Sequence, residues 1–209
     1  LKVACRHQDA RAVALLLREL SGVALGAPAG MAFFAGARAK PSPVIRLFST
    51  LVDKSSLELK LIDASAETTF IPPTASVGVS AARETHIPDI DDSPRSTLVE
   101  VPLETLAWGR SGDKGDKANV GVIARKPDYL PWIAATLTET YVADRFAHFM
   151  TSPGIDRYYL PGISALNFLL HNALGGGGIA SLRNDPQAKA YAQVLLDTPI
   201  MIPQHLLEA

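Results

Sequence analysis

The sequence has little cysteine, little net charge and no long uninterrupted apolar run, and each shortage excludes a class of protein. The single cysteine, Cys5, cannot form a disulfide within the chain, which favours a reducing compartment and predicts a cytoplasmic protein. A formal net charge of -1 gives no overall field that would attract nucleic acid or an anionic membrane, so neither is expected as a partner. The most apolar stretch, residues 12–34, is interrupted by Arg18 and Glu19 and broken from Gly26 onward, so it does not predict a membrane-spanning helix.

The histidines also lack the spacing of a metal site. His7, His86 and His205 stand apart from other ligand-type residues, and neither a metal nor a cofactor is predicted. The composition that remains, 47% hydrophobic and 20% charged, is that of a globular protein with room for one large domain or two modest ones. Because the first residue is Leu1 rather than Met, we expect the chain to be a piece of a longer polypeptide.

Residues 1–71 predict a small α/β segment. Apolar residues recur at helical spacing over residues 9–20, and Asp9 is placed to cap that helix. Strands are expected over residues 44–51 and 57–62, the second because leucines alternate there with charged residues. The following stretch, residues 72–102, is rich in proline, carries an acidic run and has few large apolar side chains, which predicts a linker or an extended arm.

Residues 103–203 predict a compact α+β domain, followed by a tail at residues 204–209. Alternating apolar residues predict strands here, and apolar residues at helical spacing predict helices between them. Since strands that are close in the chain pair with one another and helices fill one side, we expect an antiparallel sheet with helices packed on one face. The expected strands cover residues 103–108, 119–124, 155–160, 166–170 and 199–202, and the expected helices lie within residues 128–149 and 185–196.

The polar stretch of residues 109–119, expected to be a loop between two strands, is the most informative part of the sequence. Its glycines allow tight turns with exposed amides, and its basic side chains could hold an anion. Asp113 and Asp116 could instead pair with these cations, orient them or bind a divalent cation. Two interpretations stay open: a hairpin whose charges neutralise one another, and a loop that binds a ligand. The glycines are Gly112 and Gly115, and the basic residues are Arg110, Lys114 and Lys117.

A second region of interest covers residues 167–178. Asn167 and His171 are four residues apart and point to the same side in a helix or a strand, and an imidazole is suited to proton transfer near neutral pH. His171 could equally be a structural residue that bonds a neighbouring carbonyl. The four glycines from Gly175 to Gly178 do not predict a dinucleotide site, because the chain after them turns at Pro186 before a full helix can form. They predict the close approach of another backbone or of a ligand.

Two signatures in the C-terminal half resemble those of one family. Residues 110–116, continuing through residues 119–125, resemble the signature that opens the C-terminal ferredoxin-like domain of the acyclic terpene utilisation AtuA family. Residues 165–171 and the four glycines resemble its second signature, in the same order and spacing. The resemblance covers roughly residues 103–203, and residues 35–71 more loosely resemble the end of that family's larger N-terminal domain. It implies a ferredoxin-like antiparallel sheet with helices on one face, preceded by a smaller α/β segment and an extended linker.

The resemblance also implies a role in the degradation of acyclic terpenes through CoA thioesters. A branched acyl-CoA is then the expected ligand, with hydration or dehydration as the reaction and Asp113 or His171 as the catalytic residue that manages a proton. The alternative is a non-catalytic assembly module, in which the loop makes contacts between the subunits of a homo-oligomer. The residues expected to bind the ligand are Arg110, Ser111, Gly112, Lys114, Gly115, Asp116, Asn119, Asn167, Gly175, Gly176, Gly177 and Gly178.

Overall fold

The computed structural model describes residues 2–30, 39–46, 48–71, 86–90, 97–152 and 154–208. These residues belong to two compact units. One unit consists of Leu1–Arg46 and Ile87–Ala209, and the other consists of Leu47–His86.

The described part of the smaller unit contains an antiparallel hairpin. Strand β1 (Leu59–Ile62) pairs with strand β2 (Glu67–Phe70), and the 3-10 helix η1 (Lys54–Ser56) precedes them. The strand expected over residues 57–62 is therefore present from residue 59. The prediction of a strand over residues 44–51 is wrong, since no strand forms in the described residues of that range.

The N-terminal helix of the larger unit, α1 (Ala10–Leu25), begins where the sequence predicts and continues five residues further. Asp9 caps it, because its Oδ1 atom accepts a hydrogen bond of 2.9 Å from the backbone N of Arg11. Among the described residues, no helix is both long enough and apolar enough to cross a membrane.

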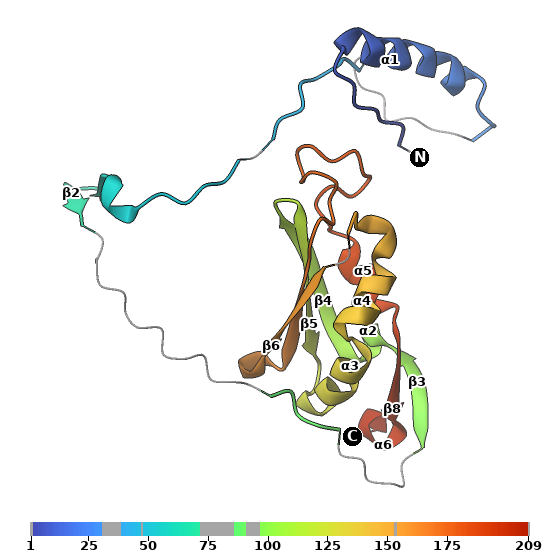
Figure 1. Ribbon diagram of the computed structural model, residues 1–209. Helices are drawn as coiled ribbons and strands as arrows, with labels where there is room; N and C mark the ends of the chain where they lie inside the picture. Colours follow the sequence, from blue (N-terminus) through green and yellow to red (C-terminus); the bar gives the residue numbers. More distant parts are fainter. Residues whose placement is uncertain are drawn as a thin grey trace. The chain divides into compact units, whose positions relative to one another are not determined.

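The larger unit is built on a four-stranded antiparallel sheet with the strand order β4-β5-β7-β6. Two hairpins are each followed by helices that lie on the same side of the sheet (Figure 1). The order strand–strand–helix occurs twice. It is a circular permutation of the βαββαβ order of a ferredoxin-like fold, in which the first strand and the first helix come last. The predicted fold class is therefore confirmed. The elements are β4 (Ala107–Lys114), β5 (Lys117–Ala124), η2 (Pro127–Tyr129), α3 (Leu130–Thr136), α4 (Glu139–Arg145), η3 (Ala147–Phe149), β6 (Ile155–Leu160), η4 (Pro161–Ile163), β7 (Ala165–Leu170) and α5 (Tyr191–Leu196).

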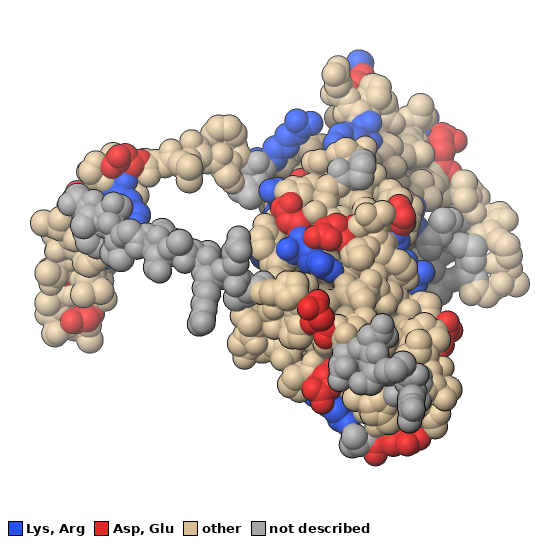
Figure 2. Space-filling model, turned by 60° about the horizontal axis from the view of Figure 1, so that its bottom comes forward, with Lys and Arg blue, Asp and Glu red and all other residues tan. Residues whose placement is uncertain are grey.

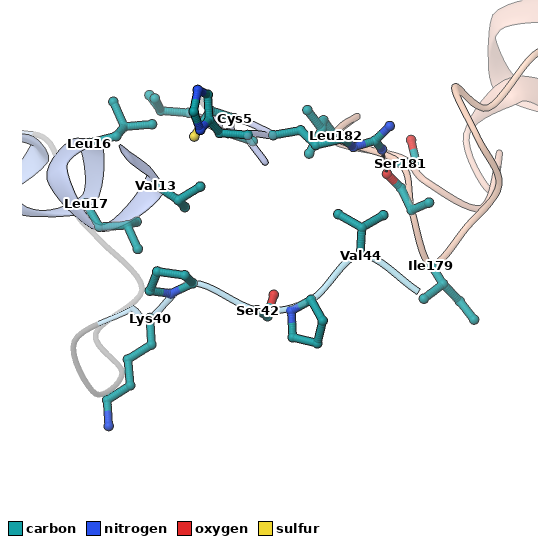
Figure 3. Close-up of a pocket in the computed structure, with 17 residues that line it drawn as sticks. Cys5, Val13, Leu16, Leu17, Lys40, Ser42, Val44, Ile179, Ser181 and Leu182 are labelled. Carbon is teal, nitrogen blue, oxygen red and sulfur yellow. Dashed lines mark hydrogen bonds between the residues drawn. The ribbon is translucent and has the colours of Figure 1, made fainter. Parts of the chain in front are cut away.

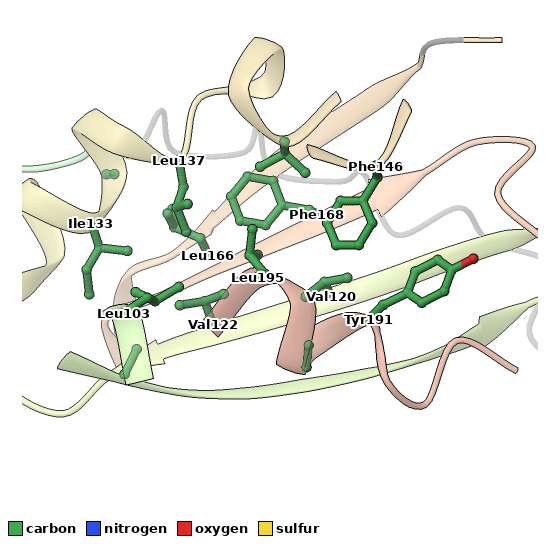
Figure 4. Close-up of a cluster of buried hydrophobic side chains, with 14 of the residues drawn as sticks. Leu103, Val120, Val122, Ile133, Leu137, Phe146, Leu166, Phe168, Tyr191 and Leu195 are labelled. Carbon is green, nitrogen blue, oxygen red and sulfur yellow. The ribbon is translucent and has the colours of Figure 1, made fainter. Parts of the chain in front are cut away.

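One hydrophobic core joins the sheet to these helices. Every second residue of the central strands β5 and β7 faces the core, and each helix presents its buried side chains to them. Figure 4 shows these side chains converging between the layers. Burying each of them contributes about 1.5–3 kcal/mol, so this layer fixes which face of the sheet is left for other uses. The fully buried members include Leu103, Val120, Ile133, Leu137, Val142, Phe146, Leu166, Phe168 and Leu195.

A second, two-stranded sheet completes the larger unit and corrects three sequence predictions. Strand β3 (Leu98–Pro102) pairs with β8 (Pro199–Pro203), so the last five residues of the expected linker are a strand; residues 72–85 and 91–96 lie outside the described residues. Helix α2 (Leu103–Leu106) replaces the expected strand start, because Leu103 and Leu106 turn into the core together. The expected tail forms helix α6 (Gln204–Glu208).

The expected helix over residues 185–196 is also shorter than predicted. The carboxylate of Asp185 accepts hydrogen bonds from the backbone N atoms of Lys189 (2.9 Å) and Ala190 (2.7 Å), and Ala188 has a positive φ of 54°. These contacts hold the segment as successive turns, so helix α5 begins only at Tyr191.

Candidate functional site

The face of the four-stranded sheet opposite the helices carries most of its polar residues, and we call it the open face. Residues directly opposite each other in neighbouring strands project to the same side, so the register defines its members. Arg110, Gly121, Asn167 and Tyr158 form one row across the sheet, and none of them belongs to the buried core. The other members are Trp108, Gly112, Lys114, Lys117, Asn119, Ile123, Asp156, Leu160, Ala165 and Leu169.

The prediction that residues 109–119 form a loop is wrong. It forms the two arms of the β4–β5 hairpin, joined by a two-residue turn at Gly115 and Asp116. Gly115 has a φ of 67°, which favours glycine at this turn. Because strand residues alternate between faces, Arg110, Gly112 and Lys114 all lie on the open face.

Four basic residues lie on or beside the open face. Arg110, Lys114, Lys117 and Lys189 form no ion pair within the described part of the chain, whereas Arg145 elsewhere pairs with Asp197 at 3.3 Å. Basic and acidic side chains are interspersed over the face shown in Figure 2. A group of unpaired cations is therefore a local feature of this sheet rather than part of a generally basic surface.

Gly112 lies near two of these cations, Lys114 and Lys189. A Cβ atom placed there would lie 3.5 Å from Nζ of Lys189 and 4.0 Å from Oδ1 of Asn119. Lys114 donates from Nζ to the same Oδ1 atom at 3.0 Å. Gly112 itself is buried, whereas Lys114 and Lys189 are exposed, so their two ammonium groups are what this part of the surface offers to an anion.

Two amide side chains continue the polar surface from there. Nδ2 of Asn119 donates to Oδ1 of Asn167 at 3.3 Å, across neighbouring strands. A Cβ atom at Gly121 would lie 3.9 Å from the same Oδ1 atom, so this partly exposed glycine lies against the pair. The pair presents hydrogen-bonding groups on the same face as the cations.

His171 and Asp156 form a hydrogen-bonded pair on this face. Nε2 of His171 lies 2.7 Å from Oδ2 of Asp156, and the hydroxyl of Tyr158 donates to the same oxygen at 3.4 Å. The bond from His171 is the main cause that holds the pKa of the Asp156 carboxyl below its usual value, and the charge of Lys117 acts in the same direction. An ionised carboxylate that orients an imidazole is an arrangement suited to proton transfer.

The structure does not bring together the two residues expected to be catalytic. Asp113 is opposite Ala118, whose side chain is in the core, so Asp113 projects to the helix side of the sheet. Its Oδ2 atom lies 3.4 Å from the position that a Cβ at Gly178 would occupy. His171 is on the open face, and the sheet itself therefore separates the two side chains.

The four-glycine loop contacts the β4–β5 hairpin, as expected, but its amides bind an internal carboxylate. Oδ1 of Asp116 accepts hydrogen bonds from the backbone N of Gly176 (2.7 Å) and of Gly177 (3.1 Å). A Cβ at Gly177 would lie 3.3 Å from the carbonyl oxygen of Gly115, and its φ of 87° favours glycine. The anion that this concave loop holds is thus the side chain of Asp116, which fastens the two signature loops together.

Ser111 also serves the fold. Its side chain is buried on the helix side, where Oγ donates to the carbonyl of Ala188 at 2.6 Å and accepts from the backbone N of Ala192 at 2.8 Å. It satisfies backbone groups at the start of α5 and is not available to a ligand.

Three members of the site carried no recognisable signal in the sequence. Asp156 and Tyr158 lie in the edge strand β6, and Lys189 belongs to the turns before α5. The alternation of β6 was visible, but which face would be covered depended on helices elsewhere in the chain. Only the folded register could place these residues beside His171 and Gly112.

A separate hollow lies elsewhere in the larger unit. It is lined by residues of the N-terminal segment, including Cys5, Leu16 and Leu17, and by residues 179–182 (Figure 3). None of the residues expected to bind ligand or to be catalytic lines it, and neither does any carboxylate side chain.

The fold defines this part of the chain as an α+β domain of the ferredoxin-like class. Residues 101–201 match the family model of the AtuA ferredoxin-like domain. This part of the chain is therefore an AtuA ferredoxin-like domain, and the resemblance of its two signatures is confirmed. No match to the chain was found among curated proteins or among solved structures. The looser resemblance of residues 35–71 stays a prediction.

Proposed function

We propose that the open face binds a small anionic ligand, with an acyl-CoA as its class, in the catabolism of acyclic terpenes. One observation carries the proposal: the cations of the hairpin are not neutralised by its carboxylates. Asp116 is bound to glycine amides and Asp113 lies on the other face. Of the two interpretations open from the sequence, the internally neutral hairpin therefore has less support.

Electrostatics favours a bound anion at this place. Like charges held on one surface repel each other, which destabilises the fold unless they serve a partner. Charge-assisted hydrogen bonds to a phosphate or carboxylate contribute about 1.5–3 kcal/mol each. Lys114 and Lys189 beside Gly112 are placed to make two such bonds, and Arg110 is available for a third.

Localising the ligand on the protein tests this proposal. Titrating the isotope-labelled chain with CoA should shift the backbone amide resonances of Gly112, Asn119 and Gly121. The amides of Gly176 and Gly177 should stay unchanged, because they already donate to Asp116. Shifts confined to the glycine loop, or no shifts at all, would contradict binding at the open face.

We propose further that His171 moves the proton in a hydration of an enoyl thioester, oriented by Asp156. A water molecule would give a proton to His171 as its oxygen bonds to C3 of the acyl group, and the same proton would then be returned to C2. The net change is the addition of H and OH across the double bond. His171 supports this role because it shares the open face with the cations and has a carboxylate partner at 2.7 Å.

The rate of this reaction tests the role of His171. The wild-type chain should consume 2-butenoyl-CoA, seen as loss of the conjugated thioester absorbance, and His171→Ala should lower the rate by about 100-fold or more. His148→Ala is the matched control, since His148 is exposed and packs beside Phe149 away from the open face. If the wild type does not react, or if His171→Ala reacts at the full rate, the proposed proton transfer is excluded, but the proposal that the open face binds a ligand is not.

The competing proposal is an assembly module that forms homo-oligomers. Exposed apolar side chains at one end of the open face favour it, since such side chains are common at subunit interfaces. In that case the open face would be covered by a second copy, and sedimentation would show an oligomer whether or not CoA is present.

A further inference from the structure

The end of the open face away from Lys114 carries a row of apolar side chains, which we call the apolar row. It consists of Trp108, Ile123, Ala165 and Leu160, which are opposite one another in the four strands. Trp108 is 54% exposed, Ile123 39% and Leu160 41%, although large apolar side chains of a sheet are normally covered. None of the four belongs to the hydrophobic core.

The row is a defined surface rather than a set of scattered side chains. Ala165 is only 1% exposed, so the accessible apolar surface of the row comes from Trp108, Ile123 and Leu160. The guanidinium Cζ atom of Arg125 lies 4.7 Å from the centre of the Trp108 ring and holds one side of the indole. Trp108 therefore presents its remaining surface in a restricted orientation.

The apolar row and the cations lie on one continuous path. Trp108 precedes Gly112 by four residues of the same strand, a distance of roughly 14 Å at the rise of a β-strand. Gly121 lies between them on the neighbouring strand, is partly exposed and projects no side chain of its own. A ligand held by its anionic group beside Gly112 can thus pass over Gly121, between Arg110 on one side and Asn167 on the other.

From this continuity we infer that the apolar row receives the hydrocarbon chain of the ligand whose anionic group binds beside Gly112. The inference rests on the proposed function and specifies the ligand as an amphipathic one, with an anionic group and an apolar chain. The path of roughly 14 Å corresponds to an alkyl chain of about ten carbons when the anionic group is a carboxylate. The same chemistry is found in free fatty carboxylates and in acyl-CoA thioesters.

A second copy of the chain is a less suitable occupant. The row takes up only one end of the face, and a full overlap of two open faces would bring the unpaired cations of both copies onto one interface. Like charges brought together in this way cost free energy. A flexible chain attached to an anion satisfies both ends of the face at once.

Affinities across two series of ligands of increasing length test the inference on the whole 209-residue chain. Calorimetric titrations would compare straight-chain carboxylates from four to twelve carbons with acyl-CoAs from acetyl to dodecanoyl. Affinity should rise about twofold per methylene, which corresponds to half the free energy of burying a methylene fully, because the row stays partly open. The rise should level off near ten carbons in the carboxylate series. In the acyl-CoA series the pantetheine arm covers part of the path, so the rise should begin with shorter chains.

Variants of the row separate this inference from the proposed function. Ile123→Ser and Trp108→Ser should flatten the dependence on chain length while leaving the affinity for CoA itself unchanged. Met201→Ser is the matched control, because Met201 is a 46% exposed apolar residue in β8, outside this sheet. Both variants remove exposed side chains, and thermal melts would verify that they fold.

Each outcome decides one of the two ideas. Two results overturn the apolar row as the site of the hydrocarbon chain and leave the proposed function standing. One is that CoA binds but affinity does not rise with chain length, and the other is that Met201→Ser flattens the dependence on chain length as much as the variants of the row do. An Ile123→Ser change in sedimentation, from an oligomer to a monomer, also overturns it by showing a subunit interface. Failure of every member of both series to bind overturns the inference together with the proposed function.

Discussion

Replacing Phe168 by alanine should remove most of the stability of the ferredoxin-like domain, whereas replacing its neighbour Leu169 should not. Phe168 is fully buried in the central strand β7, and losing a buried phenylalanine costs about 3–5 kcal/mol through lost contacts and the cavity left behind. For a domain of this size the melting temperature should fall by roughly 15–30 °C. Leu169 lies on the open face and is only partly covered, so Leu169→Ala should cost about 1 kcal/mol or less.

Urea denaturation of the two variants measures the difference directly. The comparison is sharp because the substitutions occupy adjacent positions of one strand and point to opposite faces of the sheet. Equal losses of unfolding free energy would contradict a sheet covered on one face. Such a result would also indicate that the open face is buried by something in solution, which would remove it as a ligand site.

The part of the fold with one buried face was predictable from the sequence. Strands β6 and β7 match their expected ranges to within one residue. One face of each strand packs on helices, so residues that face the helices alternate along the strand with residues that do not. The helix α1 was predictable from the helical spacing of its apolar residues, with Asp9 as a visible cap.

Strand β4 was not predictable because neither of its faces has the expected pattern. Its open face carries Arg110, Gly112 and Lys114, which are typical of a loop, and its helix side carries Gly109 and Ser111. Space is tight on that side, since a Cβ at Gly109 would lie 3.1 Å from the side chain of Leu196 in α5. The constraint comes from a helix more than eighty residues later, which local propensity does not report.

The candidate site was only partly predictable for the same reason. The basic residues and His171 were recognised from their chemistry, but the residues that lie beside them in the fold are distant in the chain. Asp156 precedes His171 by fifteen residues, and Lys189 follows Gly112 by seventy-seven. The sequence also left open whether Asp116 served a ligand, and the structure shows it bound to the glycine loop.

The second large expected effect concerns the cations themselves. In the double variant Lys114→Ala/Lys189→Ala, affinity for CoA should fall on the order of 100-fold or more, because two charge-assisted bonds of about 1.5–3 kcal/mol each are lost. The fold should be nearly unaffected, since both side chains are exposed and neither forms an ion pair in the described part of the chain. Relief of repulsion between the cations would act in the direction of slightly higher stability.

The most direct measurement is a calorimetric titration of CoA into the wild type, this double variant and a control with the same change of net charge. Lys40→Ala/Lys54→Ala is that control, since both lysines are exposed and lie outside the four-stranded sheet. The wild type and the control should bind CoA alike, whereas Lys114→Ala/Lys189→Ala should lose on the order of 100-fold in affinity. Equal affinity in all three proteins, or an equal loss in both variants, would contradict a ligand site on the open face.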